Sequence, residues 1–216
     1  QASFTYTEAG SYYPKLITRS SLACWDTFTM GPIVVHEIAA DLSIDDPLGC
    51  IPYDAQFMDQ SSTTNAIVQW EWAFGDSTTS TLQNPVHVYQ SSGFYDVKLI
   101  VTDSIGCTDS ISVPDIVYAT QPIPDFLISP EINCTDKSAV FLNLSTGSGL
   151  SYFWDFGDGD DSNLANVNHA YQDTGAYDVT LTVTDINGCD STLHIPEAVL
   201  IREVMAQFTV DTTYAS

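Results

Sequence analysis

A block of residues recurs along this chain at a fixed spacing. The run Trp72-Ala73-Phe74-Gly75-Asp76 is nearly repeated by Trp154-Asp155-Phe156-Gly157-Asp158, at an offset of 82 in the numbering. The same offset relates three further pairs of residues, which are His87 and His169, Gly93 and Gly175, and Tyr95 and Tyr177. A spacing held over several landmarks is typical of a repeat array. The chain is therefore expected to fold as consecutive copies of one small domain.

The repeated block predicts a β-strand that ends in a tight turn. Trp154 and Phe156 alternate with Asp155, which places both aromatic rings on one face of a strand. The glycines of Gly157-Asp158-Gly159 favour a turn because glycine adopts positive φ without steric cost. Further on, residues 177–183 alternate apolar and threonine or aspartate side chains, as expected for a half-buried antiparallel strand. These patterns predict a β-sandwich.

The repeated motifs resemble those of the PKD (polycystic kidney disease) domain family. The motifs are Trp-Asp-Phe-Gly-Asp-Gly from Trp154, His169-x-Tyr171 and Gly175-x-Tyr177-x-Val179. The resemblance implies an all-β fold of tandem immunoglobulin-like (PKD) β-sandwiches in an elongated array. Runs of such units with two cysteines each are also similar to those of large bacterial secreted and cell-surface adhesins, including type IX secretion substrates.

The repeat period predicts four segments. They are residues 1–37, the C-terminal half of a unit; residues 38–119 and 120–201, two complete units; and residues 202–216, the first strand of a further unit. The first assignment rests on Tyr6, Gly10 and Tyr12, which match Tyr89, Gly93 and Tyr95 at an offset of 83. Each complete unit lies within the ~50–200 residues usual for an autonomous domain.

Acidic residues dominate the charge of the chain. It has 28 Asp and Glu against 5 Lys and Arg, a formal net charge of −23, which disfavours nucleic acid and anionic membranes as partners. A hydrophobic fraction of 44% argues against a disordered acidic tail. There is no apolar run long enough to span a membrane and no signal peptide, so we expect a processed chain or an internal fragment.

The five cysteines follow the repeat. Cys107 and Cys189 hold the repeat offset of 82, and Cys50 and Cys134 are 84 apart. We expect the disulfides Cys50–Cys107 and Cys134–Cys189, with the partner of Cys24 upstream of residue 1. Disulfides predict an extracellular location, either secreted or at the cell surface. A zinc site and a catalytic thiol are disfavoured, because the sequence has neither a close cysteine pair nor a base beside a cysteine.

Few residues are candidates for chemistry. The acidic turn with Asp155, Asp158, Asp160 and Asp161 is a candidate calcium site, since calcium prefers clustered carboxylate and carbonyl oxygens. The alternative is a solvated acidic turn, because the upstream copy keeps Asp76 alone of the four. His87 and His169 are expected to be packed, hydrogen-bonded residues of the fold. No nucleophile motif or phosphate loop is present, so the sequence predicts neither an enzyme nor another cofactor.

The four tryptophans allow two interpretations. They could form a sugar-stacking platform, or they could belong to the core. The resemblance places Trp72 and Trp154 at a core position, and Trp70 shares the parity of Trp72 along its strand. Trp25 follows Cys24 in the incomplete unit, and the pattern does not assign its face.

These observations favour a non-catalytic structural or adhesive segment of a long extracellular repeat protein, such as a stalk, adhesin or surface filament. Its expected partners are neighbouring repeats, other copies of the chain, or a cell-surface protein or polysaccharide. One alternative is an accessory substrate- or polysaccharide-binding module of a secreted hydrolase. Another is a filament subunit that assembles by strand exchange.

Overall fold

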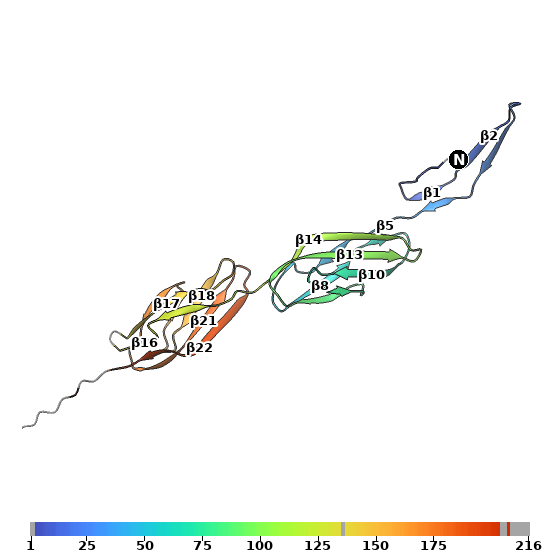
Figure 1. The fold of residues 1–216 in the computed structure, drawn as a ribbon. Coiled ribbons are helices and arrows are strands. Elements are labelled where there is room, and N and C mark those ends of the chain that lie inside the picture. The colour runs from blue at the N-terminus through green and yellow to red at the C-terminus, as the bar shows by residue number, and fades with distance from the viewer. Residues whose placement is uncertain (1–2, 135–136, 204–206, 208–216) are drawn as a thin grey trace, which may run out of the picture. The chain divides into compact units, whose positions relative to one another are not determined.

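The computed structural model describes residues 3–134, 137–203 and 207. All the regular elements among these residues are β-strands (Figure 1), which confirms the predicted all-β fold. The chain divides into two compact parts, residues 1–119 and residues 120–216. The β-sandwich of the first part is called unit 1, and that of the second part is called unit 2. In the described ranges, no helix is long and apolar enough to cross a membrane. The expected first strand of a further unit, in residues 202–216, lies outside the described residues except for residues 202, 203 and 207.

Unit 1 contains a sandwich of two sheets. The five-stranded sheet has the order β11 (Thr79–Ser80), β10 (Ile67–Ala73), β13 (Gly93–Asp103), β14 (Thr108–Thr120) and β7 (Leu48–Cys50). The three-stranded sheet has the order β12 (Val86–Tyr89), β8 (Tyr53–Asp59) and β6 (Leu42–Ile44). β5 (Ile38–Ala39) and β9 (Ser62–Thr63) form a separate, short antiparallel pair. Along each strand of the two sheets, successive side chains point to opposite faces, and those on the inner faces form the core.

Unit 2 repeats this topology. Its five-stranded sheet has the order β16 (Ile132–Asn133), β22 (Asp190–Ile201), β21 (Gly175–Thr184), β18 (Ser151–Asp155) and β19 (Asp161–Ser162). Its three-stranded sheet has the order β15 (Phe126–Ser129), β17 (Ser138–Asn143) and β20 (Val167–Ala170). The pairing of β16 with β22 is parallel, whereas the other pairings of these strands in the unit are antiparallel.

The two cores use the same residues at equivalent positions. Trp72 and Trp154 are 1% and 0% exposed, and the indole Nε1 of each donates to a backbone carbonyl ten residues further along, at 2.9 Å. The other matched buried pairs are Phe57 and Phe141, Phe74 and Phe156, Tyr89 and Tyr171, and Leu99 and Leu181. Burying several aromatic and aliphatic side chains in each unit is the main source of its stability.

The irregular alternation in β10 is a β-bulge. The register against β13 shifts between Ile67 and Gln69, where Val68 interrupts the alternation of the sequence, and the Val68 side chain is exposed. The bulge brings Trp70 and Trp72 onto the inner side. Trp70 packs against the core, and its Nε1 donates to Asp59 Oδ2 at 2.7 Å.

The N-terminal segment, residues 3–37, forms two small strand pairs. β1 (Gly10–Tyr12) pairs with β4 (Ile33–Val35), and β2 (Lys15–Arg19) pairs with β3 (Trp25–Thr29). The five residues of β2 and the five of β3 are all exposed. This segment therefore forms hairpins without a core of its own.

Candidate functional site

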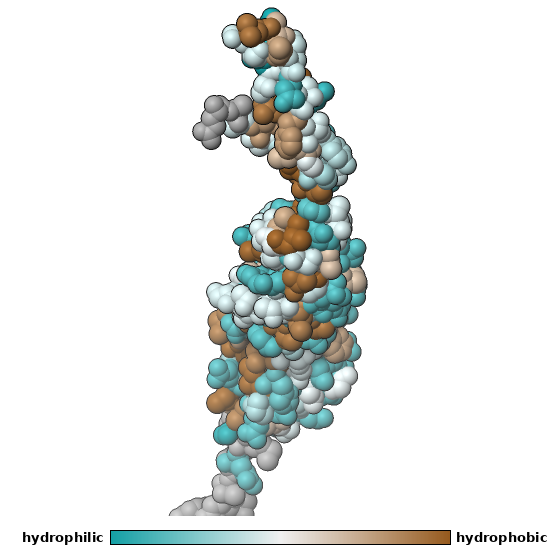
Figure 2. Space-filling view, turned by 90° about the vertical axis from the view of Figure 1, so that its right-hand side faces the viewer, coloured by the Kyte–Doolittle hydropathy of each residue, from teal (hydrophilic) through white to brown (hydrophobic). Residues whose placement is uncertain are grey.

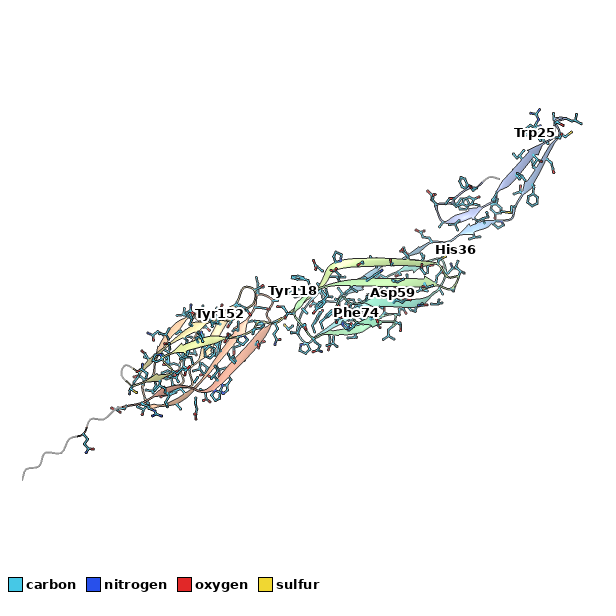
Figure 3. All side chains as sticks on the ribbon, in the orientation of Figure 1. Trp25, His36, Asp59, Phe74, Tyr118 and Tyr152 are labelled. Carbon is cyan, nitrogen blue, oxygen red and sulfur yellow. The ribbon has the colours of Figure 1, made fainter. Side chains whose placement is uncertain are left out.

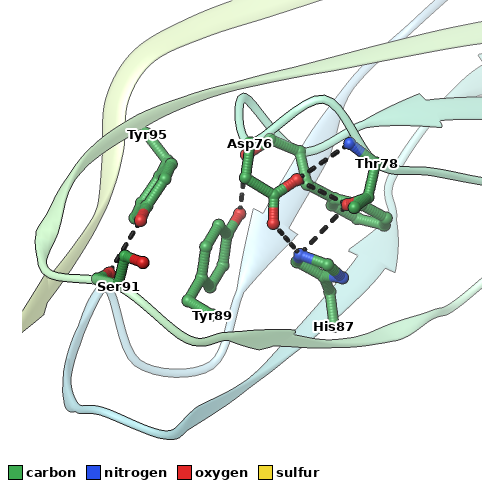
Figure 4. A network of polar contacts seen from close by, with 7 residues as sticks. Asp76, Thr78, His87, Tyr89, Ser91 and Tyr95 are labelled. Atoms are coloured by element: carbon green, nitrogen blue, oxygen red, sulfur yellow. Dashed lines mark hydrogen bonds and ion pairs between the residues drawn. The ribbon is translucent and has the colours of Figure 1, made fainter.

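Each unit holds a histidine against an aspartate in the turn of the repeated motif. In unit 1, β12 places His87 beside Asp76, and the distance from His87 Nε2 to Asp76 Oδ2 is 2.7 Å (Figure 4). The imidazole stacks on the ring of Phe74, with centroids 4.2 Å apart and planes 3° apart. Asp76 Oδ1 also accepts hydrogen bonds from the backbone N–H of Thr78, at 3.0 Å, and from its hydroxyl. The histidine is therefore a packed part of the fold.

Unit 2 repeats this arrangement. His169 Nε2 lies 2.7 Å from Asp158 Oδ2, and the imidazole stacks on Phe156 at 4.2 Å. The other carboxylate oxygen of Asp158 accepts a hydrogen bond from the backbone N–H of Asp160, at 3.1 Å. Both histidines are thus packed and hydrogen-bonded, as the sequence predicted.

The electrostatics of the unit 1 turn favour an ionised Asp76. Burial by itself would raise the pKa of its carboxyl group. The hydrogen bonds from Thr78 and His87, with the charge of His87, outweigh burial and lower that pKa below its ordinary value. Behind this pair, Tyr89 donates a hydrogen bond to the carbonyl of Phe74 at 3.0 Å, and burial raises the pKa of its phenol.

Three groups of the acidic turn in unit 2 lie close enough to share a cation. They belong to Asp158, Asp160 and His169, whose ligand atoms lie within 4.8 Å of one another. Asp155 and Asp161, also named as calcium candidates from the sequence, are not in this group; they face each other across β18 and β19. One carboxylate oxygen of Asp158 accepts a hydrogen bond from the Asp160 amide, and the other contacts His169. Both oxygens of Asp158 therefore already have partners within the protein.

Sequence reasoning missed a second aspartate that organises each unit. Asp103 and Asp185 are 1% and 6% exposed, and the Oδ1 of each accepts hydrogen bonds from backbone amides two and four residues further along. Burial alone would raise the pKa of Asp103, but hydrogen bonds from the Cys107, Ile105 and Gly106 amides and from the Asn65 side chain hold it below its ordinary value. The signal was the recurrence of Asp-x-x-Gly-Cys in both units.

The expected disulfides within each unit are wrong. Cys107 and Cys134 are free thiols, as is Cys24, whereas Cys50 and Cys189 are disulfide-bonded. Within unit 1, Cys107 immediately precedes the first residue of β14. Cys50 lies on β7, beside the other end of β14, where the Tyr118 backbone N–H donates to the Pro47 carbonyl. Ten residues of strand at about 3.3 Å each separate these ends, far beyond the ~7 Å Cα separation that a disulfide tolerates.

The same geometry keeps the cysteines of unit 2 apart. Cys189 precedes the first residue of β22, whereas Cys134 follows β16, which pairs with the last two residues of β22. The separation is again more than about 30 Å. In both units, the two cysteines therefore mark opposite ends of the sandwich.

The tryptophans do not share one exposed surface. Trp72 and Trp154 are in the two cores, and Trp70 is partly buried against the core of unit 1. Trp25 is 64% exposed at the tip of the β2–β3 hairpin, and the guanidinium of Arg19 lies 5.1 Å from its ring centroid (Figure 3). The core interpretation holds for three of the four residues.

Comparison with known proteins gives consistent matches. A family model described as PKD domain matches residues 37–117 and 119–198. Collagenase ColA of Clostridium perfringens is 60% identical over 42 residues, 19% of this chain and 4% of that protein. Collagenase ColQ1 of Bacillus cereus is 40% identical over 85 residues, 34% of this chain and 9% of that protein. The chain thus spans less than a tenth of the length of either relative.

A solved structure matches a single repeat. The crystal structure of the PKD1 domain from the Vibrio cholerae metalloprotease PrtV is 29% identical, covers 34% of this chain and 88% of that domain, and has a TM-score of 0.31.

Proposed function

Because this chain belongs to the PKD domain family, whose domains are non-catalytic modules, we propose that it is a tension-bearing stalk segment of a long extracellular repeat protein. Its role is to hold other parts of that protein at a distance while it resists extension. The disulfide bonding of Cys50 and of Cys189 supports an oxidising, extracellular setting.

In each unit, a short strand near the start pairs with the last strand, and this pairing is the main support for the proposal. In unit 2, β16 lies near the start and runs parallel to β22, the last strand. Leu200 N donates to Glu131 O at 2.8 Å, and Arg202 N donates to Asn133 O at 3.0 Å. Tension on the two ends of the unit pulls these strands in opposite directions along their axes. The hydrogen bonds are then loaded in shear and break together, which requires more force than breaking them one by one.

Unit 1 has the equivalent contact. β7 is next to β14, and Tyr118 N donates to Pro47 O at 2.7 Å. Tyr118 and Leu200 hold the repeat offset of 82, so this shear pairing is part of the repeat. Mechanical resistance is thereby built into each module separately.

Single-molecule pulling of the reduced chain by its two ends tests the proposal. We expect two unfolding events at similar force. In each event roughly 80 residues unfold, and the chain lengthens by about 3.5 Å per residue. Leu200→Pro removes the amide donor of the shear pair and lowers the force of one event, whereas Leu200→Ala keeps the donor and serves as the control. Equal forces for the two variants would contradict the stalk function.

An accessory module of a secreted hydrolase is the second candidate. The similarity to segments of collagenases ColA and ColQ1 favours it. Retention of the chain on insoluble collagen or on chitin, measured in ~0.15 M salt so that its charge is screened, separates the two functions. If the chain is a stalk segment, neither collagen nor chitin should retain it. Saturable retention on either one supports the accessory module.

A further inference from the structure

The N-terminal segment repeats the second half of each unit contact by contact. Tyr12 Oη donates to Glu8 O at 2.8 Å, as Tyr95 does to Ser91 O at 2.7 Å and Tyr177 does to Asp173 O at 3.0 Å. Each of these tyrosines stacks or tilts against the tyrosine six residues before it, with centroids 4.1, 4.3 and 4.3 Å apart. The fold of this segment is therefore that of residues 89–119 and 171–201.

The turn between β2 and β3 is also the same. Ser20 N donates to Cys24 O at 2.9 Å, as Asp103 N does to Cys107 O and Asp185 N does to Cys189 O, both at 2.9 Å. The register agrees as well, since Leu16 faces Phe28 across the hairpin as Leu99 faces Ile111 and Leu181 faces Leu193. Each side chain of the hairpin thus has a known counterpart in a complete sandwich.

Burial is where the segment differs from the complete units. Leu99 and Leu181 are fully buried, whereas Leu16 is 61% exposed. Ile111 and Leu193 pack against the cores, whereas Phe28 is 64% exposed. Leu16 and Phe28 line one open apolar hollow with Pro14 and Met30, and Figure 2 shows hydrophobic residues on the surface of this segment. We call Pro14, Leu16, Phe28 and Met30 the open face.

We propose that the open face binds the first half of a further PKD repeat, a set of strands equivalent to residues 42–89 that carries the aromatic-x-Phe-Gly-Asp turn. The complete units show what covers this face, because Leu99 and Leu181 are buried in core clusters that also contain Phe57, on the opposite sheet, and its equivalent Phe141. A flat apolar ligand or a lone strand would leave most of the open face in water. Only a whole half-sandwich supplies a matching aromatic layer.

A chain in which residues 37–92 precede residues 10–216 tests the proposal, since Gly10 then follows Ser92 as Gly93 does. Hydrogen exchange of the β2 and β3 amides is compared with that of residues 1–216. We expect exchange to slow by at least about tenfold, because these amides then open only with the new core. A second chain, with residues 121–174 before residues 10–216, provides the complement from unit 2. Unchanged exchange in both chains would overturn the proposal.

Two substitutions form a test variant and its matched control. Leu16→Asp alters the open face, whereas Ile17→Asp alters the other side of β2; both side chains are more than half exposed in residues 1–216. In the extended chains, Leu16→Asp should remove the protection and Ile17→Asp should retain it. If residues 1–216 instead form an oligomer in light scattering that Leu16→Asp alone dissociates, a second copy covers the face and the proposal is wrong.

Discussion

His87 Nε2 and Asp76 Oδ2 lie 2.7 Å apart, and His169 and Asp158 repeat this distance in the second unit. In each case, the face of the imidazole stacks on the ring of a core phenylalanine, and its Nε2 contacts the carboxylate. The histidine thus joins the turn of the repeated motif to the strand that follows it. This relationship explains why Phe-Gly-Asp and His-x-Tyr recur together at one spacing.

Loss of the carboxylate at this contact should destabilise a unit. Asp158→Ala removes the partner of His169 and the acceptor for Asp160 N, and the Asp158 side chain is only 13% exposed. We expect the free energy of unfolding of unit 2 to fall by about 1–3 kcal/mol, measured by urea denaturation. Asp160→Ala, in the same turn but exposed, is the control and should change it by less than about 0.5 kcal/mol. Equal effects of the two variants would mean that the pair contributes nothing.

Acidification should destabilise unit 1 through its two low-pKa aspartates. The pKa values of Asp76 and Asp103 lie below their ordinary value in the folded state. Their stabilising contribution is therefore complete above the unfolded-state pKa of about 3.9 and is lost as the pH falls through the folded-state values. Denaturation between pH 7 and pH 2.5 should show this loss. Asp103→Asn should reduce the pH dependence, and Asp54→Asn, at an exposed position, should leave it unchanged.

Calcium should have no specific effect on the acidic turn. Asp158 is already engaged by His169 and by a backbone amide, so binding an ion there would break existing contacts. Millimolar calcium should raise the melting temperature no more than sodium chloride of equal ionic strength, because both screen the net charge of −23. A larger rise with calcium that Asp160→Asn abolishes would show that the turn is an ion site.

The state of the cysteines can be mapped directly. Alkylation of the native, unreduced chain should modify Cys24, Cys107 and Cys134 and leave Cys50 and Cys189 unmodified. Peptide mapping by mass spectrometry should find neither a Cys50–Cys107 nor a Cys134–Cys189 peptide, because each pair is separated by the length of a sandwich. Recovery of either peptide would require a different strand order in that unit.

The repeat made most of the fold predictable. Its constant spacing and the alternation around Trp72 and Trp154 were sufficient for the all-β fold, the core aromatics and the packed histidines. The bulge at Val68 leaves a trace in the sequence, since a single residue out of phase reverses the side chains that follow it. These features depend on local patterns that survive in each copy.

The cysteine pairs could not be predicted in the same way. Equal spacing shows that Cys107 and Cys189 are equivalent, but it carries no information about which end of a strand each occupies. That depends on β14 and β22 running the length of a sandwich, with β7 and β16 beside their far ends. The buried Asp103 and Asp185 were missed for a related reason, because their role depends on a turn whose amides converge on one carboxylate.

The positions of Cys107 and Cys134 also make the protein convenient to handle. Each thiol lies at one end of its own sandwich, outside the core. Labelling at these positions therefore requires no engineered cysteine. A maleimide dye, a spin label or a glass surface can be coupled there while the hydrophobic interior stays intact. The chain thus carries its own attachment points for optical and force spectroscopy.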